Sequence, residues 1–134
     1  MVDEEQTAFM RQAMPFSAVL GVEVIKATPE EVRARVAWDE TRCTTGGALH
    51  GGLLMGLADN CGGLSAFLNL PEGATATTTI ESKTNFFRAV RSGYVTAVSR
   101  PLHAGRTTIV IDTDLLDDDG KRVARVTQTQ AVLR

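Results

Sequence analysis

The chain has 134 residues, of which 43% are hydrophobic and 22% are charged, with a formal net charge of -2 and a pI of about 5.6. This length suits one compact domain, because two domains would each lack the apolar surface for a core of their own. The composition excludes disordered and collagen-like chains, and the slightly acidic balance disfavours partners that need a basic surface, nucleic acids above all.

The ends and the cysteines of the chain indicate where such a protein would work. Its acidic start lacks the basic and then apolar pattern of a secretion signal. The longest apolar stretch, residues 53–70, carries Asp59 and Asn60 at its middle, so we do not expect it to span a membrane. Cys43 and Cys61 lack the close paired spacing of a zinc or redox motif, which predicts two free thiols and no bound metal. We therefore expect a cytoplasmic protein.

The first half of the chain predicts a short helix, a hairpin and a long helix. Residues 6–14 have an amphipathic pattern that a proline ends. Residues 22–26 and 31–38 read as two short strands, the second alternating apolar and basic side chains. From residue 51 to residue 70, leucines recur at helical spacing and nearly every face is apolar, which predicts a buried central helix.

The second half of the chain predicts a sheet. Four strand-like runs follow one another at residues 75–87, 93–101, 106–116 and 123–133, separated by turns that contain glycine. We expect the last three runs to form a meander. The order of helix, two strands, long helix and four strands predicts an α+β domain in which one antiparallel sheet wraps around one long central helix.

The start of the long helix carries the first chemical signal. Leu49-His50-Gly51-Gly52 runs directly into the helix, and the first backbone N–H groups of a helix have no partner within it. A reacting carbonyl oxygen placed against the Gly51 N–H would meet a fixed donor and the positive end of the helix dipole. The sequence therefore indicates an oxyanion site, although glycines before a helix can also serve only to allow a tight turn.

Asp59 is the second signal, because a carboxylate inside an apolar helix is costly unless it has partners. It could attack a carbonyl directly or take a proton from an attacking water, and the sequence does not choose between these roles. The alternative is a structural aspartate that bonds a neighbouring backbone group or Asn60.

The spacing of Gly51 and Asp59 predicts a shared site. Eight residues at the helical rise of about 1.5 Å each separate them by roughly 12 Å along the axis, too far to hold one carbonyl together. If both act on one bond, Asp59 must come from a second subunit whose helix lies antiparallel to the first. A homodimer with composite sites is then the minimal catalyst.

These residues resemble a known family. The motif Gly47-Ala48-Leu49-His50-Gly51-Gly52 followed by Leu57-Ala58-Asp59, together with Phe86-Phe87-Arg88-Ala89 after the next strand, is similar to hot-dog acyl-CoA thioesterases of the phenylacetate-degradation and 4-hydroxybenzoyl-CoA thioesterase type. The resemblance covers nearly the whole chain. It implies a hot-dog fold, hydrolysis of an acyl-CoA thioester, no cofactor beyond the substrate itself, and dimers that are usually paired into a tetramer.

The resemblance also implies roles for single residues. Gly51 would polarise the thioester carbonyl, Asp59 would be nucleophile or general base, and His50 would help to position substrate or water, although a histidine there can also be a structural cap. Thr79 falls where relatives place a hydroxyl beside the acidic residue. Thr44 stands where many relatives have Asn or Gln to hold water, a departure from the pattern. The remaining candidates, for contacts to coenzyme A, are Gly52, Arg88 and Arg106.

Two other functions remain open. Hot-dog hydratases act on enoyl-CoA with an Asp and His pair on a different motif, and the His50-Gly51-Gly52 motif argues against that reaction here. Other proteins of this fold bind acyl-CoA as a ligand or sensor without turning it over.

Overall fold

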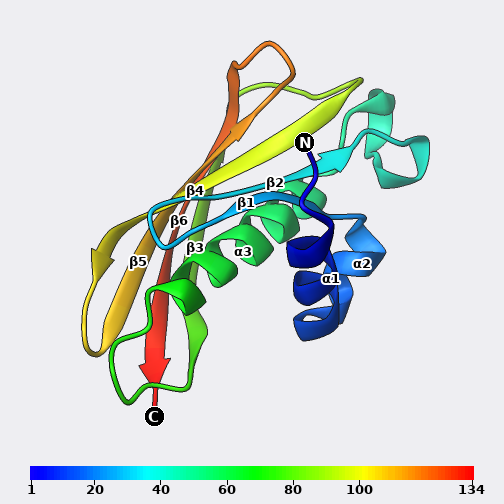
Figure 1. Ribbon diagram of the computed structural model, residues 1–134. Coiled ribbons are helices and arrows are strands. Elements are labelled where there is room, and N and C mark those ends of the chain that lie inside the picture. Colours follow the sequence, from blue (N-terminus) through cyan, green and yellow to red (C-terminus); the bar gives the residue numbers. More distant parts are fainter.

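The computed structural model describes residues 1–134 as an antiparallel sheet that curves around a long helix. Figure 1 shows the sheet behind helix α3 and the two N-terminal helices beside it. The elements in chain order are α1 (Glu4–Ala13), α2 (Pro15–Leu20), β1 (Glu23–Ala27), β2 (Val32–Ala37), the 3-10 turns η1 (Glu40–Arg42) and η2 (Thr45–Gly47), α3 (Gly51–Leu68), β3 (Ala76–Phe86), β4 (Tyr94–Ala104), β5 (Thr108–Leu116) and β6 (Arg122–Leu133).

The sheet has six strands in the order β1-β2-β4-β5-β6-β3, and all its neighbours are antiparallel. The expected β1–β2 hairpin and β4–β5–β6 meander are therefore confirmed. β3 crosses over to pair with β6 and forms one edge of the sheet. Its side chains are largely exposed, among them Ile80 at 63% and Phe86 at 50%. An exposed edge strand has unpaired backbone N–H and C=O groups, with which a second sheet can pair.

The core lies between α3 and the concave face of the sheet. Leucines of α3, such as Leu57 and Leu64, pack against alternate residues of the strands, such as Val36 and Leu115. Burial alternates strictly along β2 and β5, as the period of a half-buried strand requires. The predicted α+β domain with one central helix is confirmed. No helix combines the length and apolar character needed to cross a lipid bilayer.

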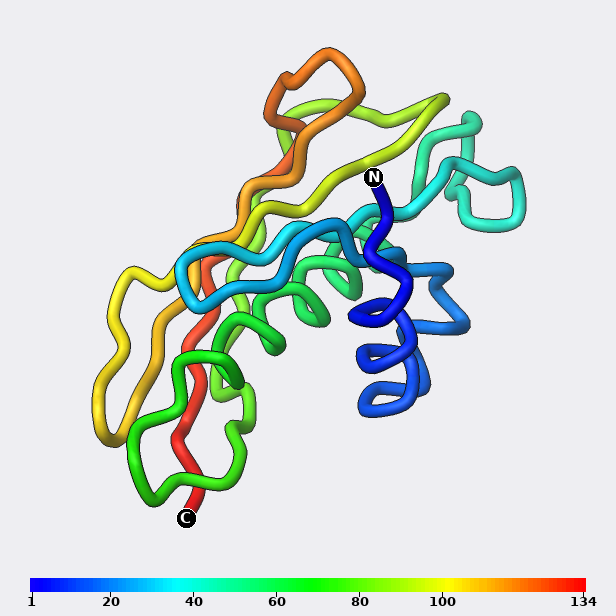
Figure 2. Tube along the Cα trace, viewed as in Figure 1, coloured from blue at the N-terminus to red at the C-terminus, as the bar shows by residue number.

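The N-terminal region differs from the expectation of one helix that ends at a proline. Pro15 does end α1, but it also starts a second helix, α2, where it occupies the first turn. Proline is tolerated at that position because its missing N–H would have no partner there in any case. In Figure 2 helices α1 and α2 lie next to each other, beside α3. The amide of Asp3 donates to the carbonyl of Val24 on β1 at 2.7 Å, which ties this pair to the sheet.

Strand β4 continues three residues beyond its predicted end at Pro101. Its pairing with β2 ends at Ser99, so Pro101 is bonded to a neighbour on one side only, β5. A proline, which has no N–H to donate, is accepted at such an edge position, and the register shifts between Pro101 and His103.

Candidate active site

The loop before α3 is held in place by backbone bonds. The Leu49 amide donates to the carbonyl of Val90 at 2.9 Å, and the His50 amide donates to the carbonyl of Arg42 at 3.0 Å. His50 is the N-cap of α3, where its Nδ1 accepts a hydrogen bond of 2.8 Å from the Gly52 amide. The structural role for His50 is therefore present, and because Nδ1 accepts, a neutral ring carries its proton on Nε2.

Gly51 presents a free backbone donor at the positive end of the helix dipole. The amides of Leu53 and Leu54 donate to the His50 carbonyl at 3.0 and 3.2 Å. With the Gly52 amide bonded to His50, the Gly51 N–H is the one in the first turn without an acceptor. Glycine also allows close approach, because a Cβ at Gly51 would lie 3.2 Å from the Phe86 ring. These are the features that an oxyanion donor requires.

Asp59 lies two turns further along α3, on the side that faces β3. Its Oδ1 accepts hydrogen bonds from Thr79 Oγ1 at 3.3 Å and from Gln128 Nε2 at 3.4 Å. The expected neighbour Thr79 is thus in contact with Asp59. Asn60 points elsewhere and donates to the carbonyl of Gly56 at 2.8 Å.

The expectation that α3 is buried on every side is wrong for the single chain. Gly52, Met55, Asp59 and Phe67 are exposed and follow one another along one side of the helix. The Asp59 carboxylate is therefore exposed, not buried. The sheet and the N-terminal helices leave this stripe open, while the leucines on the other faces of α3 are buried as predicted.

Two glutamines under Asp59 escaped the sequence analysis. Gln128 and Gln130 lie on β6 with 0% and 2% exposure, on the inner face of the sheet. Gln130 Nε2 donates to Thr79 Oγ1 at 2.7 Å. The signal that could have found them is the period of two in this strand, since Ala124 and Val126 on the same face are apolar core residues.

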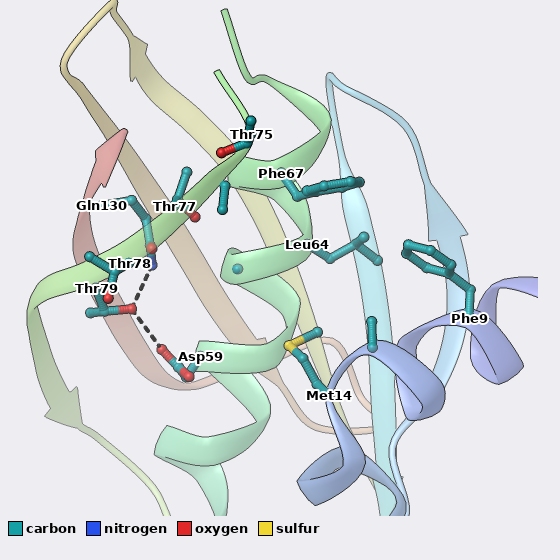
Figure 3. A pocket seen from close by; sticks show the side chains of 13 residues that line it. Phe9, Met14, Asp59, Leu64, Phe67, Thr75, Thr77, Thr78, Thr79 and Gln130 are labelled. Atoms are coloured by element: carbon teal, nitrogen blue, oxygen red, sulfur yellow. Dashed lines mark hydrogen bonds between the residues drawn. The ribbon is translucent and has the colours of Figure 1, made fainter. Parts of the chain in front are cut away.

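A groove of about 450 Å³ opens beside Asp59, as Figure 3 shows. One wall consists of the threonines of β3 and of the turn before it, and Gln130 lies at its base. The other wall is apolar. Its side chains come from α1 and α3 and are Phe9, Ala13, Met14, Leu64 and Phe67. Asp59 is the only ionisable side chain among the residues that line the groove.

The other predicted residues lie in different hollows of the same chain. Gly51 lines a hollow with Phe86 and Arg88, while His50 and Gly52 line another one beside α2. Neither hollow includes Asp59. The separation along the helix that the spacing predicted is thus also a separation between surface hollows.

Thr44 and the two arginines lie apart from Asp59. Thr44 is exposed between η1 and η2, and its amide donates to the carbonyl of Ala48 at 2.8 Å. Arg88 and Arg106 are both exposed, but Arg88 bonds to the start of β6 and Arg106 lies in the β4–β5 turn near the end of β6. The length of that strand separates them by roughly 30 Å, so in one chain they cannot hold the same phosphate.

The cysteines are both free thiols, as expected. Cys61 is completely buried and its Sγ lies 3.3 Å from the carbonyl oxygen of Val32. Burial raises the pKa of this thiol to about 12, which makes it a poor nucleophile despite its place near Asp59 in the sequence. No three His, Cys, Asp or Glu side chains come together as a metal site.

Comparisons with known proteins place the chain in a family. Residues 46–124 match the family model of the thioesterase superfamily. The protein PA1618 of Pseudomonas aeruginosa is 35% identical over 115 residues, which are 86% of this chain and 79% of that protein.

Two further comparisons agree. The crystal structure of a variant of PA1618, described as a thioesterase, aligns with a TM-score of 0.88 and 33% identity over 98% of this chain and 94% of that one. The proofreading thioesterase EntH of Cronobacter turicensis is 29% identical over 85% of this chain and 82% of its own length. These matches confirm the hot-dog fold and the resemblance to hot-dog thioesterases, and the chain belongs to the thioesterase superfamily.

Proposed function

We propose that this protein hydrolyses acyl-CoA thioesters to a carboxylic acid and coenzyme A, with no further cofactor. Thioester hydrolysis is the chemistry of its family. The observation that carries the proposal is the pair of groups on α3, namely the unpartnered Gly51 N–H at its start and the Asp59 carboxylate two turns later. One is a donor for a developing negative oxygen and the other is a base or nucleophile.

In the proposed reaction the Gly51 N–H donates to the thioester carbonyl oxygen as it gains negative charge. Asp59 either takes a proton from a water that attacks the carbonyl carbon, or attacks that carbon itself and forms an anhydride that water then cleaves. In both routes the C–S bond breaks, the thiolate of coenzyme A leaves and is protonated, and one water is consumed. In the general-base route the oxygen of that water joins the acyl carbon. In the anhydride route it joins the acyl carbon or, when water attacks the carboxyl carbon of Asp59, it stays in Asp59 while an Asp59 oxygen leaves with the acyl product. The appearance of ¹⁸O in Asp59 after a single turnover in H₂¹⁸O therefore identifies the anhydride route.

The site we propose is shared by two subunits. Gly51 and Asp59 lie in separate hollows of one chain, and Asp59 belongs to the exposed stripe of α3 next to β3, the free edge of the sheet. A partner whose α3 is antiparallel to the first would place its Gly51 near Asp59 and pair with the open edge at β3. The composite dimer, and its pairing into a homotetramer, are proposals of the same kind.

Contacts to coenzyme A follow from the same arrangement. Arg88 is exposed and lines the hollow that contains Gly51, so its guanidinium is the favoured candidate for a phosphate of a substrate bound there. In one chain Arg106 lies too far away to assist it, and a role for Arg106 would require the partner subunit. We propose that Gly52 lies beside the substrate, because it follows Gly51 directly in the chain.

Thiol release from a panel of aryl and aliphatic acyl-CoA thioesters tests the reaction. Turnover of at least one acyl-CoA is expected, with a much weaker reaction on the matching N-acetylcysteamine thioester, which has the same acyl group but no phosphates. Equal rates of hydrolysis for the coenzyme A thioester and the N-acetylcysteamine thioester would contradict recognition of coenzyme A. Binding without thiol release would indicate a sensor, and loss of enoyl absorbance would indicate a hydratase.

Mixing two inactive variants tests the shared site. Gly51→Pro removes the N–H at the first helical position, where proline fits, and His50 before it already has the extended φ of -62° and ψ of 134° that proline requires. The added Cβ would lie 3.2 Å from the Phe86 ring, so that ring must shift slightly. Heterodimers of Gly51→Pro with Asp59→Asn contain one site with both groups intact. Activity should return on subunit exchange, to about half of the wild-type value for each heterodimer and therefore to about a quarter of it for an equimolar mixture, in which half of the dimers are heterodimers. No recovery after exchange is demonstrated by mass spectrometry would contradict a composite site.

A further inference from the structure

The two oxygens of the Asp59 carboxylate are in different situations. Oδ1 accepts from both Thr79 and Gln128, at 3.3 and 3.4 Å. No donor of the chain reaches Oδ2. Figure 3 shows Asp59 beside β3, with the chain of bonds from Gln130 through Thr79 ending on it. The carboxylate is thus held by one oxygen and leaves the other for a substrate or water.

Gln128 is poorly explained as a stabilising core residue. Its side chain is fully buried on β6, and its Oε1 has no hydrogen-bond partner. A buried amide oxygen without a partner destabilises the fold, and an apolar side chain of the same length would avoid this loss. The contact that an apolar residue could not make is the bond from Nε2 to Asp59.

The helix above Gln128 is shaped to admit its carboxamide. Gly62 lies one turn after Asp59 on α3, and a Cβ at Gly62 would lie only 2.1 Å from Gln128 Oε1. Any other residue at this position would displace the carboxamide. The neighbouring Gly63 shows no such requirement, since a Cβ there meets nothing within 4 Å.

Gln130 acts one bond further away. Its Nε2 donates to Thr79 Oγ1 at 2.7 Å, so the hydroxyl accepts from Gln130 and its own proton is free to point at Asp59. Without Gln130, the Thr79 hydroxyl could turn away. Two buried amides of one strand therefore control both donors that meet Oδ1.

We propose that Gln128 is a positioning residue for Asp59, and that Gln130 orients Thr79 for the same purpose. Together they hold Oδ1 and make Oδ2 the oxygen that acts on the thioester or its water, an inference that rests on the proposed function. The bonds of 3.3 and 3.4 Å are long for a carboxylate acceptor. Such bonds commonly tighten when substrate excludes water from a site.

The test is Gln128→Met, which keeps the length of the side chain and removes both its donor and its unpartnered oxygen. We expect kcat to fall about 10-fold while KM changes less than about twofold, because the acid–base or nucleophilic step is affected and binding is not. The melting temperature should stay the same or rise.

Three further variants complete the experiment. Gly62→Ala keeps Gln128 but pushes its carboxamide aside, and should reproduce the loss in kcat, with Gly63→Ala as the matched control for the melting temperature. Thr129→Val changes the same strand on its opposite face and should leave all kinetic constants unchanged. A kcat of Gln128→Met within twofold of wild type, or a loss of kcat accompanied by a lower melting temperature and an equal rise in KM, overturns the proposal.

A measurement without turnover separates this proposal from the proposed function. The side-chain ¹³C carboxyl signal of Asp59, recorded by NMR at one neutral pH, should change its chemical shift in Gln128→Met and stay unchanged in Thr129→Val, because only the first substitution removes a hydrogen bond to Oδ1. An unchanged signal in Gln128→Met overturns the positioning role even if thioesters are hydrolysed. A changed signal supports it even if no thioester in the panel is a substrate.

Discussion

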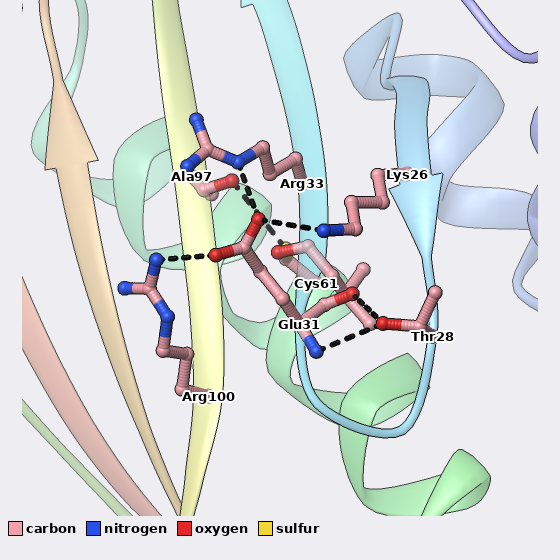
Figure 4. A network of polar contacts seen from close by, with 8 residues as sticks. Lys26, Thr28, Glu31, Arg33, Cys61, Ala97 and Arg100 are labelled. Carbon is pink, nitrogen blue, oxygen red and sulfur yellow. Dashed lines mark hydrogen bonds and ion pairs between the residues drawn. The ribbon is translucent and has the colours of Figure 1, made fainter.

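Two carboxylates of this molecule, Glu31 and Asp59, are held in opposite ways. Glu31 lies at the start of β2, and its side chain is 11% exposed. It accepts from Arg33 Nε at 2.6 Å, pairs with Arg100, and lies 3.5 Å from Lys26 Nζ, so that both of its oxygens have charged partners (Figure 4). Asp59 is exposed, meets only a hydroxyl and an amide, and keeps one oxygen free.

This difference distinguishes a carboxylate with a structural role, Glu31, from one that is available for chemistry, Asp59. The hydrogen bond from Arg33, reinforced by the charges of Arg33, Arg100 and Lys26, lowers the pKa of Glu31 from 4.5 to about 2. A carboxylate tied in this way joins β2 to β4 but is unavailable to a substrate. Neutral donors orient a carboxylate without pairing its negative charge with a cation, so Asp59 can still act as base or nucleophile.

The largest expected effect is the loss of turnover in Asp59→Asn. The amide oxygen of Asn can accept the same bonds from Thr79 and Gln128, so the fold and melting temperature should be retained. Thiol release should fall by about 10³-fold, because the base or nucleophile is gone. The matched change of acid to amide at Glu31 should not have this effect, and activity of Asp59→Asn within tenfold of wild type would contradict the assigned role.

Glu31→Gln should show the reverse pattern. Removing the charge leaves Arg33 and Arg100 facing a neutral amide. Because both arginines are partly exposed, solvent reduces the effect, and we expect the unfolding free energy to fall by on the order of 2 kcal/mol. Urea unfolding measures this loss. Thiol release well below the melting temperature should stay within about threefold of wild type. A stability equal to wild type would mean that the Glu31 network is only a solvated contact.

The pH dependence of stability sharpens the same comparison. The pKa of Glu31 is lower in the folded chain than its usual value, so its contribution is fully present above 4.5 and is lost as the pH falls through about 2. The difference in unfolding free energy between wild type and Glu31→Gln should therefore shrink across this window. Urea titrations at a series of pH values test this, and a difference that stays constant down to about pH 2 would contradict the pairing.

Thr79→Val should have the smallest of these effects. It removes one donor to Asp59 and leaves the Gln130 amide without its acceptor, at a cost of about 1 kcal/mol in stability. We expect kcat to fall about fivefold, since Gln128 still holds Oδ1. Thr79→Ser restores the hydroxyl and should recover most of the loss. If Thr79→Val and Thr79→Ser have the same kcat, the Thr79 hydroxyl does not contribute to turnover.

The sequence was sufficient for the strands and the long helix, because hydrophobic periodicity determines both. It failed where one residue has two possible meanings. The sequence predicts that Pro15 ends a helix, and in the structure this proline also starts the next helix. The sequence predicts that Pro101 ends a strand, but β4 continues past it because its pairing with β2 has already ended.

For the site, the sequence singles out Asp59, the family resemblance implies that Thr79 lies beside it, and the structure places the two in contact. It could not show that Asp59 is exposed, because an apolar helix looks buried whether or not the chain itself covers every face. Nor did it find Gln128 and Gln130, whose importance depends on a crossover that places β3 beside β6. The pairing of β3 with β6 is set by the topology of the sheet and cannot be inferred from the sequence pattern of either strand alone.

The groove beside Asp59 takes its reactive group from α3 but part of its apolar wall from α1, where Phe9 and Ala13 lie. Both of these side chains are exposed, whereas Met10 on the other side of the same helix belongs to the core. The wall of the groove can therefore vary at these two positions with little effect on the core. In a laboratory library, diversity confined to Phe9 and Ala13 would change the shape of the groove while Asp59 and its partners stay constant.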